Sequence, residues 1–306
     1  MKIGVIGRTE ILFRTVNNLR SAGHEIVHII TAKEAPEYNK TSEDFRKLAD
    51  KWNVPFIHTP RIIEAKQTIT EVSPDIGISV NYPGIIPQEV IDLFPHGILN
   101  AHGGDLPRYR GNACQAWAIL NGEERIGLCI HKMIGGELDS GDIITREYLD
   151  IDDNTKVTKC WEWMVDKIPI LFLEALDKLQ QDSRYVLEQQ SVGPEDTLRC
   201  YPRAPEDGRI DWRKSNVEIL RLINASNKPY AGAFCDFEGK KMIIWDAEIV
   251  ENKEIFCAVP GQVTLADESF VELACGRGKL RLKEVEIGGQ SGLPNQWLKS
   301  VRKRLQ

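Results

Sequence analysis

Long apolar runs are missing from this chain of 306 residues, and without a run of about 18 residues no transmembrane helix is expected. The first residues, Lys2–Gly7, look like a strand and lack the charged-then-apolar pattern of a signal peptide. The 7 cysteines are odd in number and form no Cys-x-x-Cys pair, which disfavours a disulfide framework and a structural zinc site. These absences favour a cytoplasmic protein with reduced thiols and no membrane partner.

A basic surplus is also missing. The formal net charge is -6 and the sequence pI is about 5.7, whereas a dedicated nucleic-acid binder usually carries a basic patch. The basic stretch 299–304 is interpreted as a solvated tail. Hydrophobic residues (42%) and charged residues (27%) are in the proportions of an ordinary globular protein. We therefore expect a small-molecule substrate and no nucleic-acid partner.

The motifs that bind phosphates through glycine-rich loops are incomplete. Gly4-x-x-Gly7 lacks the full Gly-x-Gly-x-x-Gly pattern and its acidic partner, so a tight strand–helix turn explains it better. There is no Walker lysine motif, which disfavours nucleotide hydrolysis. The histidines His24, His28, His58 and His96 do not have the spacing of metal ligands, so no metal is expected at them.

Strand-like and helical stretches alternate in the first half of the chain, which predicts βαβ units and a mainly parallel sheet. The predicted strands are Lys2–Ile6, Glu25–Thr31, Val54–His58, Ile76–Val80, Gly97–Asn100, Ile126–Met133 and Ile143–Ile151. The predicted helices are Ile11–Ala22, Thr41–Trp52 (capped by Thr41 or Ser42) and the long Val157–Leu179.

The composition changes after the long helix. Residues 182–203 are polar and irregular and are interpreted as a linker, which divides the chain into domains 1–200 and 201–306. A short helix, Asn216–Ala225, precedes several short strands with close turns, a pattern typical of a small β-barrel. Those strands are Gly232–Phe237, Lys241–Ile249, Gly261–Leu265, Phe270–Ala274 and Lys279–Ile287.

Asn100-Ala101-His102 and Asp139 together supply an amide, an imidazole and a carboxylate. Residues two apart on a strand point to the same face, so Asn100 and His102 should emerge side by side at the strand's carboxyl end, where ligands bind in open α/β sheets. Asp139 follows the next strand and could orient the imidazole. The set suits acyl transfer.

The segment Asn100–Gly111 with Leu138-Asp139-Ser140-Gly141-Asp142-Ile143 resembles the signature of the 10-formyltetrahydrofolate-dependent formyltransferases. Pro205-Glu206-Asp207-Gly208, Pro229–Phe234 and Pro260-Gly261-Gln262-Val263 resemble the C-terminal domain of the sugar-nucleotide branch. The run Gly103-Gly104-Asp105 departs from the family pattern, which usually carries a serine and an extra leucine there. The resemblance implies a Rossmann-like catalytic domain followed by a small OB-like β-barrel.

The resemblance also implies roles for residues. Asn100, His102 and Asp139 would be catalytic, and 10-formyltetrahydrofolate would be the formyl donor, with no metal. A loop held by two prolines would line the folate pocket, and the predicted cofactor contacts are Asn81, Tyr82, Gly84, Ile85, Ile86 and Asp142. Asp142 also suits a turn or helix cap. The predicted substrate contacts are Arg108, Tyr109, Arg110 and His131, the arginines as a phosphate clamp. The alternative for His131 is a core histidine whose ring nitrogens have partners. The alternative for Arg108 and Arg110 is a solvated turn.

The favoured activity is formyl transfer to the primary amine of a nucleotide-linked amino sugar, such as a 4-amino-4,6-dideoxyhexose for a surface polysaccharide. The segment after the second strand, 32–38, is short and acidic, whereas methionyl-tRNA formyltransferase has a longer basic insertion there. Three alternatives stay open: a methionyl-tRNA formyltransferase, a 10-formyltetrahydrofolate hydrolase and a catalytically idle binding module. A homodimer is a further expectation.

Overall fold

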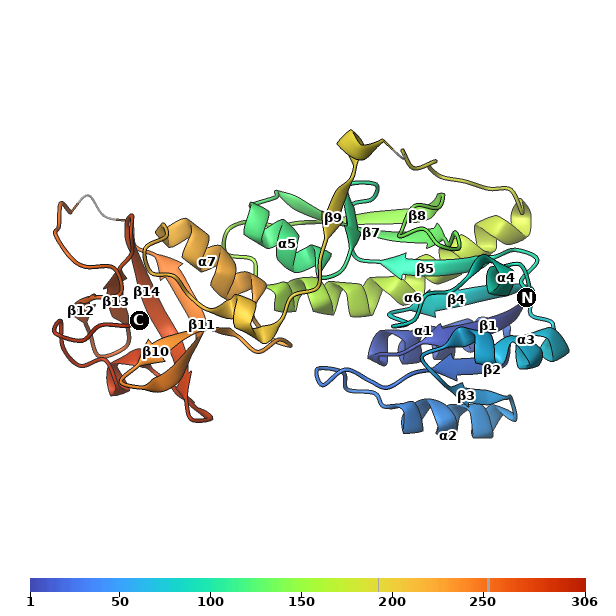
Figure 1. Ribbon diagram of the computed structural model, residues 1–306, viewed down its shortest axis with the longest axis horizontal. Helices are drawn as coiled ribbons and strands as arrows, with labels where there is room; N and C mark the ends of the chain where they lie inside the picture. Colours follow the sequence, from blue (N-terminus) through green and yellow to red (C-terminus); the bar gives the residue numbers. More distant parts are fainter. Residues whose placement is uncertain (192, 252–253) are drawn as a thin grey trace. The chain divides into compact units, whose positions relative to one another are not determined.

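The computed structural model describes residues 1–191, 193–251 and 254–306, and its strands form two main sheets (Figure 1). The strands are β1 Lys2–Gly7, β2 Glu25–Thr31, β3 Phe56–His58, β4 Ile76–Val80, β5 Ile98–His102, β6 Tyr109–Gly111, β7 Arg125–Lys132, β8 Ile143–Asp150, β9 Leu198–Cys200, β10 Ala233–Phe237, β11 Lys240–Ile249, β12 Val263–Ala266, β13 Val271–Ala274, β14 Lys279–Ile287 and β15 Gln290–Gly292. The helices are α1 Glu10–Ser21, α2 Ser42–Trp52, α3 Lys66–Val72, α4 Gln88–Ile91, α5 Cys114–Asn121, α6 Val157–Gln181 and α7 Asn216–Ala225. Single 3₁₀ turns are η1 Ile62–Ala65, η2 Pro194–Asp196, η3 Pro205–Gly208 and η4 Pro294–Gln296.

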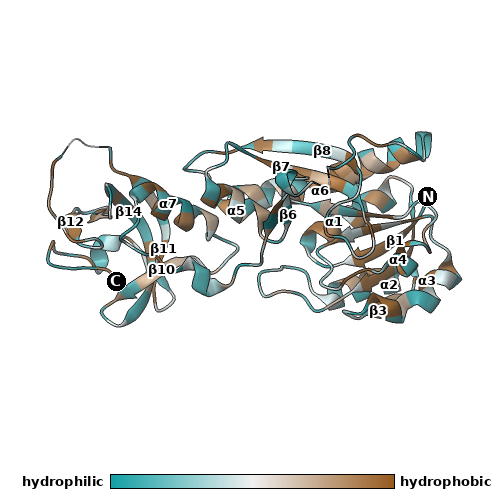
Figure 2. Ribbon diagram, turned by 45° about the horizontal axis from the view of Figure 1, so that its top comes forward, coloured by the Kyte–Doolittle hydropathy of each residue, from teal (hydrophilic) through white to brown (hydrophobic). Residues whose placement is uncertain are grey.

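The first sheet has seven strands in the order β3-β2-β1-β4-β5-β7-β8. The neighbouring strands β3, β2, β1, β4 and β5 pair in parallel, whereas β5 and β7 pair antiparallel. Both faces are covered, which explains why β1 is apolar along its length (Figure 2). Ile3 and Val5 of β1 pack with α1, α2 and α6, whereas Ile6 packs with α3 and α4. The predicted α/β fold with a mostly parallel sheet is therefore confirmed.

Local sequence signals explain where the helices begin. Thr41 caps α2, and its backbone N–H donates to Asp44 Oδ2 at 2.9 Å in a reciprocal capping box. Ser215 caps α7 in the same way, with Glu218 as its partner. Thr9 caps α1, its hydroxyl oxygen accepting from the Leu12 N–H at 3.3 Å.

The main errors of the sequence prediction lie in short elements. The predicted strand Val54–His58 begins only at Phe56, and β6, α3, α4 and α5 were not predicted. The segment 182–203 is not wholly irregular, because Leu198–Cys200 forms β9 and pairs in parallel with β6. Three-residue strands carry too little alternation of apolar and polar residues to be recognised from sequence.

The second sheet is antiparallel, in the order β10-β11-β14-β13-β12, with β15 pairing to β14. Its core includes Trp212, Met242 and Leu282, and α7 contributes Ile219 and Ile223. The C-terminal antiparallel β domain is therefore confirmed, while its closure into an OB-like barrel stays a prediction.

The chain separates into two compact units. The first comprises Met1–Cys114, Ile126–Leu149 and Trp161–Tyr201, and the second comprises Gln115–Arg125, Asp150–Cys160 and Pro202–Gln306. The short segment around Asp153 belongs to the second unit through α7: Arg221 pairs with the Asp153 carboxylate at 2.8 Å, and Asn224 donates to its carbonyl at 2.7 Å. All the predicted site residues lie in the first unit.

Candidate active site

Strand β5 brings Asn100 and His102 to one face of the sheet, as the sequence predicts. The antiparallel partner β7 adds a third polar side chain, because His131 stands opposite Asn100 in the pairing register. His102 and His131 are 6% and 2% exposed, and their rings lie edge to face with centroids 6.2 Å apart. Two buried imidazoles therefore flank the amide of Asn100.

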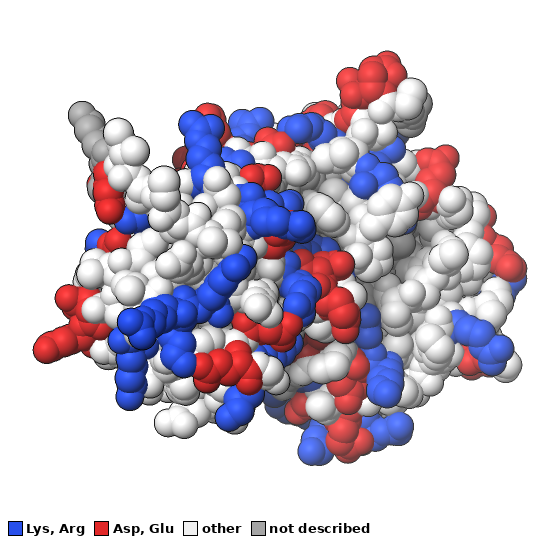
Figure 3. Space-filling view, turned by 60° about the vertical axis from the view of Figure 1, so that its left-hand side comes forward, with Lys and Arg blue, Asp and Glu red and all other residues white. Residues whose placement is uncertain are grey.

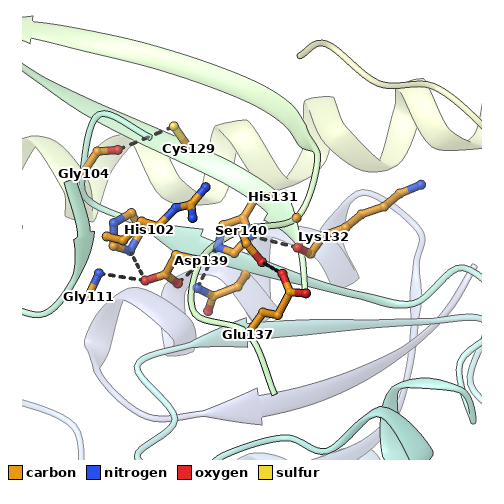
Figure 4. Close-up of polar contacts among 12 residues, drawn as sticks. His102, Gly104, Gly111, Cys129, His131, Lys132, Glu137, Asp139 and Ser140 are labelled. Atoms are coloured by element: carbon orange, nitrogen blue, oxygen red, sulfur yellow. Dashed lines mark hydrogen bonds and ion pairs between the residues drawn. The ribbon is translucent and has the colours of Figure 1, made fainter. Parts of the chain in front are cut away.

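Asp139 lies in the turn between β7 and β8, and its carboxylate meets both histidines (Figure 4). Its Oδ2 lies 3.4 Å from His102 Nδ1, and its Oδ1 lies 3.5 Å from His131 Nε2. Oδ2 also accepts the backbone N–H of Gly111 at 2.9 Å. The three predicted catalytic residues are therefore brought together by two segments of the chain, strand β5 and the turn between β7 and β8.

The charge of Asp139 is stabilised by these contacts. Burial alone would raise the pKa of this carboxyl, but the neighbouring His102 and His131 and the N–H of Gly111 outweigh it and hold the pKa well below its usual range. The carboxylate is thus ionised across the physiological range, and it can stabilise a positive charge that develops on His102.

The hydrogen-bond partner of Nε2 determines the tautomer of His102. Nε2 lies 2.6 Å from the carbonyl oxygen of Tyr109, which can only accept, so Nε2 carries a hydrogen. In the neutral ring the lone pair is then on Nδ1, the atom that faces Asp139. A proton arriving at Nδ1 would lie between the imidazole and the carboxylate.

Asn100 is oriented by His131. The Nδ1 of His131 donates to the carbonyl of Lys132 at 2.9 Å, and its Nε2 lies 3.2 Å from the amide nitrogen of Asn100 and 3.5 Å from Asp139 Oδ1. The second N–H of the same amide is not used in this contact, so it can serve a substrate oxygen. His131 is 2% exposed and both of its ring nitrogens have partners, as expected for a satisfied core histidine, and its role as a substrate contact stays a prediction.

The remaining predicted substrate residues have structural contacts. Tyr109 is buried and gives its carbonyl to His102, while the guanidinium of Arg108 lies over the Tyr109 ring at 5.3 Å. Arg110 donates to the side-chain oxygen of Gln190 at 3.1 Å and to the carbonyl of Ser191 at 2.8 Å. Arg110 thus supports a neighbouring segment, and a phosphate clamp by either arginine stays a prediction.

The predicted folate loop, Asn81–Pro87, alternates between exposed and half-buried residues, and only Ile86 in it is buried. Asn81 donates to the Tyr38 hydroxyl at 3.2 Å, the Tyr82 hydroxyl donates to the Thr59 carbonyl at 2.8 Å, and Ile86 lies in the core. Ile85 is 83% exposed, a large apolar side chain with no cover. Gly84 packs too closely on the Pro60 carbonyl to admit a side chain.

This loop borders the turn that carries Asp139. The N–H of Gly135 donates to the side-chain oxygen of Gln88 at 2.9 Å, so the two loops touch. Ile85, three residues before Gln88, is exposed and apolar, which suits one wall for a flat heteroaromatic ring. The backbone carbonyl of Asp142, another predicted cofactor contact, accepts from the backbone N–H of Lys132 at 2.9 Å. The described part of the chain holds no group of three or more residues that could bind a metal ion.

Sequence reasoning missed several residues around the site. Asp105, where the family pattern is broken, pairs with Arg146, and Arg146 pairs with Glu188 at 3.0 Å. The thiol of Cys114 lies 3.7 Å from His102 Nε2. Gln190 contacts the Asp139 turn from a segment interpreted as a linker. Only the break in the family pattern at Asp105 gave any signal in the sequence.

Known protein families and known proteins resemble this chain along most of its length. The chain matches the family described as Formyl transferase over residues 1–176 and the Formyl transferase C-terminal domain over residues 203–302. A methionyl-tRNA formyltransferase of Geobacter metallireducens is 25% identical over 97% of this chain and 94% of its own length. Among the described residues, no helix is both long and apolar enough to cross a membrane.

Two solved structures share the fold at lower identity. WlaRD, a sugar 3N-formyltransferase, has a TM-score of 0.69 at 19% identity and covers 95% of this chain and 98% of its own. An N-formyltransferase from Helicobacter canadensis has a TM-score of 0.68 at 17% identity and covers 92% and 99%. Because both formyl transferase patterns are matched in order and the first spans more than half of the chain, the protein belongs to the formyl transferase family of enzymes.

Proposed function

We propose that this enzyme transfers a formyl group from 10-formyltetrahydrofolate to the primary amine of a nucleotide-linked amino sugar. The observation that carries the proposal is the convergence of Asn100, His102 and Asp139 at the carboxyl end of β5. An amide donor, an imidazole and an ionised carboxylate are the groups that amine formylation needs. The folate donor supplies an activated formyl group.

Proton transfer is the task of His102 and Asp139. An amine attacks only when its lone pair is free, so a proton must leave it before or during attack. We assign Nδ1 of His102 as the atom that takes this proton, because Nε2 is already held by the Tyr109 carbonyl. The imidazolium that results has an acceptor at each ring nitrogen, Tyr109 at one and Asp139 at the other.

Charge on the formyl oxygen is the task of Asn100. His131 contacts the amide nitrogen of Asn100 at 3.2 Å, which restrains the amide while a second N–H stays available for the formyl oxygen. A donor fixed in advance stabilises an oxygen that gains negative charge during the reaction, an effect of about 3 kcal/mol in other enzymes. His131 would thus act on the substrate indirectly, through its contacts with Asn100 and Asp139.

The donor would bind at the loop Asn81–Pro87. Ile85 offers an exposed apolar surface, and the contact between Gly135 and Gln88 places the loop against the catalytic turn. Structural neighbours were solved with 5-N-formyl-tetrahydrofolate and with folinic acid. A reduced folate should therefore raise the melting temperature of this protein, because a ligand selective for the native state stabilises it.

The acceptor is proposed from three observations. The neighbours were solved with dTDP and with dTDP-3-aminofucose, the chain carries a formal net charge of -6, and the segment 32–38 is short and acidic. Figure 3 shows Lys and Arg interspersed with Asp and Glu over much of one face. A small acceptor with a diphosphate needs only a few local cations, whereas tRNA engages many.

Methionyl-tRNA is the second candidate acceptor. Curated relatives at 25% and 29% identity carry that name and match along nearly their whole length. Figure 3 also shows one place where basic side chains gather closely, which would suit RNA phosphates. This candidate predicts an affinity for tRNA that falls steeply with salt concentration.

One assay separates the two. Purified enzyme with 10-formyltetrahydrofolate is offered a panel of nucleotide-linked 3-amino and 4-amino sugars and, separately, charged initiator tRNA. We expect formylation of at least one sugar nucleotide and none of the tRNA. Efficient tRNA formylation with no sugar product would reject the proposed acceptor, and formate release without any acceptor would indicate a hydrolase.

A further inference from the structure

Gln190 lies against the turn that carries the catalytic carboxylate. Its side-chain nitrogen donates to the carbonyl of Asp139 at 2.9 Å and to the carbonyl of Gly141 at 2.6 Å. The backbone continues this contact nearby, where the N–H of Ile143 donates to the Glu188 carbonyl at 2.9 Å. A stretch that looks like a polar linker in the sequence therefore braces both sides of the Asp139 turn.

The orientation of the Gln190 amide is fixed by its partners. Two carbonyl oxygens can only accept, and the guanidinium of Arg110 can only donate, so nitrogen must face Asp139 and Gly141 and oxygen must face Arg110. Arg110 is itself held by the carbonyl of Ser191 at 2.8 Å. The amide thus has a complementary partner at each of its polar atoms.

The turn needs this support because of its backbone shape. Asp139 has a φ of 49°, in the left-handed region that residues with a Cβ disfavour. Gly141 packs so closely on the Lys132 carbonyl that a Cβ would collide. Without outside contacts the turn would relax, and the carboxylate would move away from His102, whose Nδ1 is already 3.4 Å distant.

We propose that Gln190 is a positioning residue that holds the Asp139–Gly141 turn in the shape that presents the Asp139 carboxylate to His102. Arg110 supports Gln190 by donating to its amide oxygen. Arg110 also precedes Gly111 on β6, and the backbone N–H of Gly111 donates to Asp139 Oδ2. This inference rests on the proposed role of Asp139 in catalysis. A residue of the segment after α6 would thus affect the chemical step by positioning Asp139.

The first test removes the side-chain N–H groups of Gln190. Gln190→Met keeps the length and neutrality of the side chain but donates to neither carbonyl, and Gln189→Met is the matched control at the exposed neighbour. We expect Gln190→Met to lower kcat by about tenfold or more while both KM values stay within about threefold, because misplacing a reacting group affects the chemical step. Gln189→Met should behave as the unmodified enzyme. Unchanged kcat in Gln190→Met would overturn the inference.

Gln190→Glu provides a second variant should the methionine variant fail to fold. The carboxylate still accepts from Arg110 but offers no N–H to Asp139 or Gly141. A fall in kcat similar to that in Gln190→Met supports the inference. Normal kcat with Gln190→Glu would mean that the Arg110 contact alone matters, and it would overturn the role assigned to the turn.

A double-mutant cycle tests whether Gln190 acts through Asp139. In the Asp139→Asn background, measured in single turnover, Gln190→Met should have almost no further effect, since the group it positions is lost. A purely structural role would lower the rate by the same factor in both backgrounds and would contradict the inference. If Asp139→Asn alone keeps near-normal kcat, it is the proposed function that fails, so the two failures are distinguishable.

Discussion

A buried histidine in the first unit should make the stability of this enzyme depend on pH. His28 on β2 is 0% exposed, and neither ring nitrogen has a hydrogen-bond partner among the described residues. Its ring packs edge to face on Phe94, with centroids 6.1 Å apart, and against Gly4, where any side chain would collide with it. Burial lowers the pKa of His28 from 6.5 to about 3.

The sign and size of the effect follow from this shift. The folded pKa lies below the unfolded value, so the unfolded chain takes up the proton first. The stability contributed by the neutral ring is complete above pH 6.5 and is lost as pH falls from 6.5 toward about 3. Between about pH 7.5 and about pH 5, this single group should lower the free energy of unfolding by about 2 kcal/mol.

His28→Leu tests this reasoning. The variant removes the titration and two unpaired buried polar atoms, so it should be more stable than the unmodified enzyme, and its advantage should be about 2 kcal/mol larger at about pH 5 than at about pH 7.5. Urea titrations read by hydrogen exchange of the β1 and β2 peptides report opening of the first unit. His58→Gln, which removes an exposed imidazole, should keep the original pH dependence. An equal advantage of His28→Leu at both pH values would refute a neutral buried ring.

Three further predictions concern the site and the thiols. Asn100→Ala should lower kcat by about a hundredfold to a thousandfold with little change in either KM, as measured by steady-state formylation, because one oxyanion donor is lost. Gly141→Ala should lower both kcat and the melting temperature, because its Cβ would collide with the Lys132 carbonyl; an active, equally stable variant would contradict the tight packing of the turn. Alkylation of the native enzyme should modify Cys257 first, as the one exposed thiol described, and peptide mass spectrometry would detect any competing site.

The architecture was predictable where elements are long and regular. Strands such as Ile76–Val80 carry a β-branched apolar residue at every second position, and helices such as Ser42–Trp52 carry a cap and an acidic first turn. These signals are local, so the sequence alone predicts the element. β6 and β9 are different, because each has three residues and forms only by pairing with the other across more than eighty positions in the chain. No window of the sequence contains that partnership.

The same distinction separates predicted from missed site residues. Asn100 and His102 share a strand, and two-residue alternation places them together without knowledge of the fold. Gln190 reaches the site only because the chain returns past β8 after α6, where the backbones of Leu187 and Glu188 bond to Ile143. A glutamine in a polar stretch resembles a solvated residue until its two carbonyl partners are known. Supporting contacts of this kind are set by tertiary structure, so the sequence gives them no pattern.

His131 illustrates how burial changes the interpretation of a predicted residue. At 2% exposure it is as buried as a core histidine, but its ring contacts Asn100 at 3.2 Å and Asp139 at 3.5 Å. The Lys132 carbonyl accepts from Nδ1, while Nε2 faces both the Asn100 amide and the Asp139 carboxylate. The catalytic arrangement therefore includes a fourth side chain, which contacts both Asn100 and Asp139.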